Sequence, residues 1–168
     1  RPMTDDLRSS IAAIVRRFDK EGIGSVVASE FEADDVIASI AHKVMKAGGR
    51  VTVLSTDKSF CQLLSDTVFV YDHFSGQNRD RRYVQERFGV EPDQLVDLFA
   101  LAGDVSLDIP GVRGIGVRTA AKLLCDYGSL ENVLAAANRI PGKLGSKILK
   151  GKGSARLSHR LVALCSNA

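Results

Sequence analysis

The chain of 168 residues has only three cysteines, and no apolar run in it approaches the length of a membrane span. Cys61, Cys125 and Cys165 are odd in number and have no short metal-ligand spacing, which argues against a disulfide framework and a zinc site. A transmembrane helix and a secretory segment are likewise not indicated. We therefore expect an intracellular, cytoplasmic protein with no membrane partner.

Histidine is also scarce, and charge of neither sign dominates. His42, His73 and His159 are widely separated and lack catalytic partners nearby, so we interpret them as surface or packing residues. The net charge of +3 permits a polyanionic ligand without indicating one. The placement of the cations is more informative, because they gather in residues 79–87 and 143–160. The first group fits a solvated face and a DNA-backbone contact equally well.

The apolar pattern divides the chain into two parts. In the first part it predicts helices over 4–19, 33–47 and 58–64, and strands over 23–29, 51–55 and 68–71. Beyond that it predicts helices only, over 82–88, 92–102, 117–127, 130–138, 145–150 and 154–165. We infer an α/β fold in which residues 1–80 form a body with a parallel sheet and residues 81–168 form a helical lobe.

A glycine-rich turn that opens into a helix is the most informative segment. Gly114 and Gly116 allow close backbone approach, and the free N–H groups of the first helical turn form an anion site. With the preceding helix, this turn predicts a helix-hairpin-helix that binds the DNA sugar-phosphate backbone. The expected DNA contacts are Gly114, Ile115, Gly116, Val117, Arg118, Thr119 and Lys122. A lone G-x-G is more often a plain turn, but the flanking cations and helix favour a ligand site.

Acidic residues follow the predicted strands and the first hairpin helix. They form three groups along the chain: Glu32, Asp34 and Asp35; Asp57; and Asp104. In an open α/β sheet, such positions face one crevice. Carboxylates there would hold Mg²⁺, which activates water for attack on a phosphodiester. Capping explains each group taken alone, so the prediction depends on their combination.

Four motifs, in this order and at these separations, resemble the 5′-nuclease (flap endonuclease) family, which includes the 5′-3′ exonuclease domain of bacterial DNA polymerase I. They are Glu32-Ala-Asp-Asp-Val-Ile, Ser55-Thr-Asp-Lys, Leu101-Ala-Gly-Asp and Ile109-Pro-Gly-Val-x-Gly-Ile-Gly. The stretches after Ser55 and Ser129 are most similar to stand-alone bacterial members. The resemblance implies a PIN-like parallel sheet flanked by helices, with a helix-three-turn-helix motif at residues 92–127 of the helical lobe.

The resemblance also implies a set of ligands. Catalysis would depend on Asp34, with Glu32 and Asp35, at a first Mg²⁺ site, and Asp57 and Asp104 would belong to a second. It further implies a K⁺ ion that bridges the hairpin to a DNA phosphate. Its ligands would be the main-chain carbonyls of Leu101, Ala102, Pro110, Val112 and Ile115.

Two residues depart from the family pattern. Ser59 and Leu107 stand where many members carry Asp, which lowers the negative charge available to a second divalent ion. We therefore expect one Mg²⁺, with the second site impaired. The family's first strand and its helical arch would precede Arg1.

These observations predict a structure-specific, metal-dependent 5′-nuclease that hydrolyses phosphodiesters in branched, 5′-flap or 5′-overhang duplex DNA, acting as a monomer. The alternative is a DNA-structure-binding module that retains the hairpin but has little catalytic activity. Ser59 and Leu107 favour this alternative.

Overall fold

The computed structural model describes residues 4–168, which divide into two compact units, one ending at Ala33 and one spanning Asp34–Ala168. The first unit contains α1 (Asp5–Lys20), which begins where the Thr4 hydroxyl accepts a hydrogen bond from the Leu7 N–H. The strand expected over residues 23–29 is wrong. A strand needs a hydrogen-bonded neighbour, and no described segment pairs with these residues.

A small sheet forms the α/β part of the second unit. Its strands are β1 (Val51–Leu54), β2 (Val68–Asp72) and β3 (Gln77–Asn78), in that order. β1 and β2 are parallel, with Val51 opposite Val68, whereas β3 adds to β2 in the antiparallel direction. The sequence predicted the parallel pair, but it predicted no strand at residues 77–78. The helix α2 (Ala33–Lys46) precedes β1.

The connection between the parallel strands contains a 3₁₀-helix, η1 (Lys58–Leu63). Phe60 points its ring into a core that it shares with Val53 and Val70 of the strands. Cys61 is fully buried, and this burial raises the pKa of its thiol to about 11, so the thiol stays protonated and unreactive at neutral pH. Cys61 is therefore a core residue.

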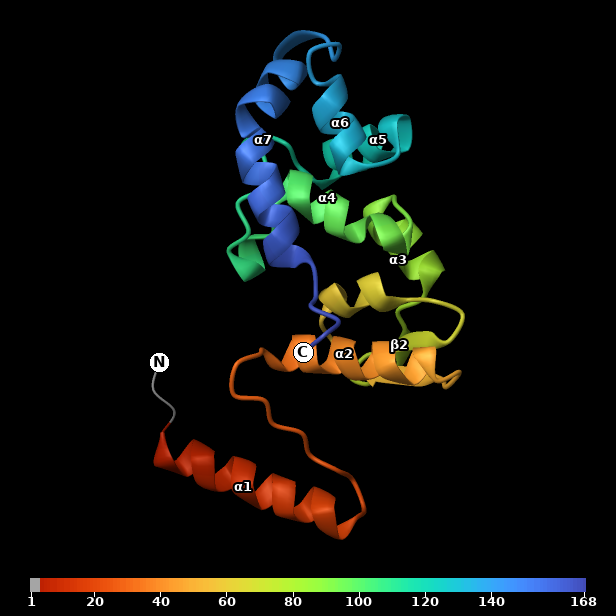
Figure 1. Ribbon diagram of the computed structural model, residues 1–168, viewed down its shortest axis with the longest axis vertical. Helices are drawn as coiled ribbons and strands as arrows, with labels where there is room; N and C mark the ends of the chain where they lie inside the picture. The colour runs from red at the N-terminus through yellow and green to blue at the C-terminus, as the bar shows by residue number, and fades with distance from the viewer. Residues whose placement is uncertain (1–3) are drawn as a thin grey trace. The chain divides into compact units, whose positions relative to one another are not determined.

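The rest of the second unit is helical, as predicted. Its elements are α3 (Arg81–Phe88), η2 (Pro92–Gln94), α4 (Leu95–Ala102), η3 (Val105–Leu107), α5 (Val117–Tyr127), α6 (Leu130–Ala136) and α7 (Gly142–Val162). α4 is apolar on nearly every side, so it is buried at the centre of the lobe, where it packs against α5 and α7 (Figure 1).

α7 is one continuous helix, although its glycines predicted two helices over 145–150 and 154–165. Two of these glycines lie at close contacts. A Cβ at Gly151 would come 2.6 Å from a methyl carbon of Val112, and one at Gly145 would collide with the carbonyl of Ile140. The missing side chains therefore let α7 pack closely, and this packing outweighs the low helix propensity of glycine.

The end of the chain returns to α2 (Figure 1). The backbone N–H of Cys165 donates to the Asp35 carboxylate at 2.8 Å, and the N–H of Ala168 donates to the Ser39 hydroxyl at 2.8 Å. The last residues thus connect α7 to the α/β part of the unit. No helix in residues 4–168 is both long and apolar enough to cross a membrane.

Candidate active site and nucleic-acid interface

A pocket of about 730 Å³ lies where the sheet meets the helical hairpin. Asp57 enters it from the end of β1, Asp104 from the end of α4, and Gly116 from the start of α5. The pocket therefore brings two of the three predicted acidic groups next to the predicted phosphate-binding turn. Its other lining residues are Thr56, Lys58, Arg79, Tyr83, Arg87, Phe88, Phe99, Ala102, Gly103, Val105 and Val117.

Asp57 is oriented by its neighbours in the loop after β1. Its carboxylate accepts a hydrogen bond from the Ser59 N–H at 2.8 Å and so caps η1, while its own N–H donates to the Ser55 hydroxyl at 3.0 Å. Helix capping, the alternative explanation for this residue, is therefore confirmed as part of its role. One carboxylate oxygen makes the cap, which leaves the other available to a ligand.

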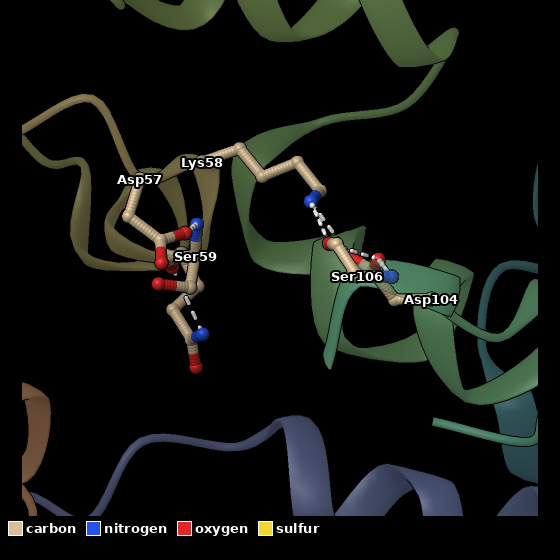
Figure 2. A network of polar contacts seen from close by, with 6 residues as sticks. Asp57, Lys58, Ser59, Asp104 and Ser106 are labelled. Carbon is tan, nitrogen blue, oxygen red and sulfur yellow. Dashed lines mark hydrogen bonds and ion pairs between the residues drawn. The ribbon is translucent and has the colours of Figure 1, made fainter. Parts of the chain in front are cut away.

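Asp104 has a stronger partner. Its carboxylate accepts hydrogen bonds from the N–H and hydroxyl of Ser106, and the Lys58 ammonium lies 2.8 Å from its other oxygen. Figure 2 shows the Lys58 side chain extending from η1 to reach Asp104 and Ser106. Burial raises the pKa of Asp104, but the hydrogen bonds from Lys58 and Ser106 outweigh it and hold the pKa below its ordinary value. Asp104 is therefore an ionised carboxylate already paired with a cation.

The acidic residues at the start of α2 lie in different surroundings. Asp34 and Asp35 occupy its first turn and are half-buried, and Asp35 holds the Cys165 N–H. Glu32 is exposed and belongs to the first unit. Across residues 4–168, no three Asp, Glu, His or Cys side chains gather closely enough to hold a metal ion. The ligand roles of these acids stay predictions.

The chemistry of the two acid groups toward a divalent ion differs. The carboxylates of Asp34 and Asp35 are hard oxygen donors of the kind that Mg²⁺ takes. The Asp57 and Asp104 pair does not fit a second divalent ion, because Lys58 already occupies the Asp104 carboxylate. The number of divalent ions that the protein binds stays a prediction.

The hairpin turn depends on glycine backbone geometry. Gly103, Gly111 and Gly114 have φ of +74°, +59° and +78°, in the left-handed region that favours glycine. The Leu101 carbonyl accepts the Val112 N–H at 2.8 Å, which joins the end of α4 to the turn. The Val112 carbonyl accepts the Ile115 N–H at 2.9 Å. A carbonyl oxygen has a second lone pair, so the K⁺ ligand set remains a prediction.

The start of α5 has the features of an anion site. Gly116 is its N-cap and provides no side chain to satisfy the first N–H groups, and a Cβ at this position would meet nothing within 4 Å. Arg118 and Lys122 are exposed beside it, and Thr119 is half-buried. The side chain of Ile115 is buried and that of Val117 half-buried, so these two can meet DNA mainly through their backbone.

Three residues of α7 that the sequence analysis missed hold the hairpin turn. The buried Ser158 hydroxyl accepts the Gly111 N–H at 2.9 Å, and the Ser154 hydroxyl donates to the Gly111 carbonyl at 2.5 Å. The Lys147 ammonium donates to the Gly114 carbonyl at 2.9 Å. The spacing of Lys147, Gly151, Ser154 and Ser158 places them on one helix face, and this is the signal that could have identified them.

Comparison with family models identifies both halves of the chain. Residues 1–89 match the model described as the 5′-3′ exonuclease N-terminal resolvase-like domain, and residues 90–168 match the 5′-3′ exonuclease C-terminal SAM fold. The chain belongs to the 5′-3′ exonuclease family. The family resemblance and the fold class are therefore confirmed, whereas the boundary predicted near residue 80 stays a prediction.

Curated proteins and solved structures agree with this assignment. Flap endonuclease Xni of Sodalis glossinidius (strain morsitans) is 40% identical over 163 residues, which cover 97% of this chain and 65% of that protein. The chain thus spans about 65% of the length of this relative.

The structural neighbours are more distant in sequence. A mutant of the T5 5′-exonuclease matches with a TM-score of 0.81 at 23% identity, over 94% of this chain and 66% of that one. A T5 flap endonuclease in a pseudo-enzyme-product complex with DNA and metal ions matches with a TM-score of 0.74 at 23% identity, over 98% of this chain and 62% of that one. At this identity the likeness establishes the fold.

Proposed function

We propose that the protein to which this chain belongs is a structure-specific, metal-dependent 5′-nuclease that cleaves branched, 5′-flap or 5′-overhang duplex DNA. One observation carries the proposal: a single pocket holds the carboxyl side chains of Asp57 and Asp104 beside the start of α5, where no side chain caps the first N–H groups. A phosphodiester bound by the α5 N–H groups would lie next to carboxylates that help to organise its hydrolysis. The family membership and the name of the Xni relative support the same activity.

We assign to the site residues the roles that the sequence motifs predict. Asp34 is the principal ligand of one Mg²⁺, and Glu32 and Asp35 support it directly or through water. The ion, when bound, supplies an activated water and offsets phosphate charge. The backbone of residues 114–117, with Arg118, Thr119 and Lys122, holds the duplex downstream of the cut. The carbonyls of the hairpin turn hold K⁺, and the protein works as a monomer in the cytoplasm.

Cleavage of a labelled 5′-flap duplex by the full-length protein with Mg²⁺ tests the proposal. We expect Asp34→Ala to lower the cleavage rate by about two orders of magnitude or more, as removal of one charge-stabilising group in an active site typically does. Asp126→Ala, which changes an exposed acid at the end of α5, serves as the matched control and should cleave normally. Equal rates for the Asp34→Ala and unaltered proteins would refute the metal role.

The rival function, a DNA-structure-binding module with little catalysis, has one observation in its favour. The Lys58 ammonium holds the Asp104 carboxylate, so this acid is not free to bind a second divalent ion. The same assay separates the two functions. Tight binding of the flap duplex without any cutting, under conditions in which the hairpin is intact, would support the module.

A further inference from the structure

The Lys58 ammonium is held by several contacts inside the pocket. Its ammonium lies 2.8 Å from the Asp104 carboxylate, donates to the Ser106 hydroxyl at 3.3 Å and lies 5.7 Å from the centre of the Phe99 ring. Only 30% of the Lys58 side chain and 9% of the Asp104 side chain are exposed. Three contacts therefore hold a positive charge inside the pocket, whereas an ordinary surface lysine would move freely in solvent.

The surroundings of this ammonium lack what a second divalent ion needs. Ser59 provides only a neutral hydroxyl and Leu107 an apolar side chain, so neither adds a carboxylate to those of Asp57 and Asp104. Figure 2 shows the Asp57 carboxylate turned toward Ser59 and away from the Lys58 ammonium. A divalent ion at Asp104 would have to displace Lys58 and then find few other oxygens.

We propose that the Lys58 ammonium is a built-in cation that takes the place of a second divalent ion on the Asp104 side of the pocket. It offsets the Asp104 charge and presents positive charge to the phosphate of a DNA strand that enters beside Gly116. Lysine suits this role because its charge is compact and its stem reaches across from η1. The inference rests on the proposed nuclease function. In it, Lys58 is a positioning residue whose charge lets the enzyme cleave DNA with one bound divalent ion.

Counting Mn²⁺ ions tests the inference without relying on activity. Electron paramagnetic resonance of the full-length protein should find one bound Mn²⁺, and Lys58→Met should bind a second, weaker ion. The added substitution Asp104→Asn should abolish that second ion, because Asp104 is its ligand. Lys58→Arg keeps the positive charge and should still bind a single Mn²⁺ ion. Lys150→Met, an exposed lysine of α7, is the matched control for lost charge and should also bind a single ion.

The outcomes are distinguishable. Two ions on the unaltered protein, or one ion on Lys58→Met, would overturn the inference, provided that thermal melting shows the variant to be folded. Cleavage gives a second readout: Lys58→Met should cut slowly at low Mn²⁺ and recover at high Mn²⁺, when the second ion replaces the ammonium. Asp34→Ala reports separately on the proposed function, because loss of the first ion there is independent of Lys58.

Discussion

At the residue scale, the geometry of Asp57 and Asp104 allows each carboxylate to cap a helix and to face a further partner. Asp57 and Asp104 each cap a short 3₁₀-helix through one oxygen, by accepting the N–H of Ser59 and Ser106. The cap fixes the direction of the carboxylate and uses only one of its two oxygens. For Asp104 the further partner is Lys58. Helix capping by Asp57 and Asp104 is therefore compatible with the proposed site role.

Asp72 offers a pH prediction at the same scale. A hydrogen bond from Arg79, at 2.9 Å, lowers its pKa from 3.8 to about 2. The folded carboxylate thus releases its proton more readily than the unfolded one, so its contribution to stability is complete above pH 3.8 and is lost as the pH falls through about 2. We expect Arg79→Gln to lower the free energy of unfolding at neutral pH, with a smaller difference from the unaltered protein at pH 2.

Urea titration of the full-length protein at several pH values measures this difference. Arg82→Gln is the matched control, because its ion pair with Glu86 is 82% and 64% exposed and should contribute little at any pH. A constant difference between Arg79→Gln and the unaltered protein across the acid range would contradict the role of Asp72.

At the element scale, α7 shows how packing overrides local propensity. Its sequence contains Gly145, Gly151 and Gly153, which predict a break, yet residues 142–162 form one helix. The helix carries the serines that hold the hairpin turn, and Gly151 lets it approach Val112 of that turn. The predicted break in α7 was wrong because the contacts that favour glycine at these positions are made with residues far away in the sequence.

Two glycines of α7 therefore should respond oppositely to alanine. Gly151→Ala places a Cβ 2.6 Å from the Val112 methyl carbon, and we expect it to destabilise the protein by about 1–3 kcal/mol through overpacking. Gly153→Ala meets nothing within 4 Å and should stabilise it by about 0.5–1 kcal/mol through helix propensity. Chemical denaturation of both variants checks the pair. Equal effects of the same sign would show that α7 does not contact the turn as described.

At the scale of the second unit as a whole, function depends on joining the sheet to the hairpin. Asp57 and Lys58 follow β1, Asp104 follows α4, and the proposed anion site lies at Gly116, the N-cap of α5. These residues come from segments far apart in the sequence, and the shared pocket depends on the packing of α4 at the centre of the lobe.

DNA binding gives the prediction at this scale. Gly116 has φ of −100°, which any residue adopts, and open space around it, so Gly116→Val should still fold, with only the small loss of stability that valine causes at an N-cap. It should weaken binding of duplexes by about tenfold or more, since a hydrogen bond to a charged group contributes about 1.5–3 kcal/mol. The loss should be similar for duplexes of different base sequence, because phosphate contacts do not read bases. Fluorescence anisotropy measures the affinity, and an unchanged value would refute the anion site.

The sequence alone predicted much of the local structure. Helix periodicity placed α2 and α5 to within a residue, and the glycines at 114 and 116 predicted the turn before α5. These features depend on neighbours in the chain, so they can be read from it. The strand predicted over 23–29 failed because pairing is a property of two segments, and apolar composition shows only one of them.

What only the tertiary structure decided is which distant groups meet. The sequence showed Lys58 and Asp104 as separate members of two motifs, and the fold makes them an ion pair. In the same way Ser154 and Ser158 became partners of Gly111. Such contacts depend on how α4, α7 and the sheet pack together, and this packing follows from burial of apolar surface over the whole unit, which no local pattern encodes.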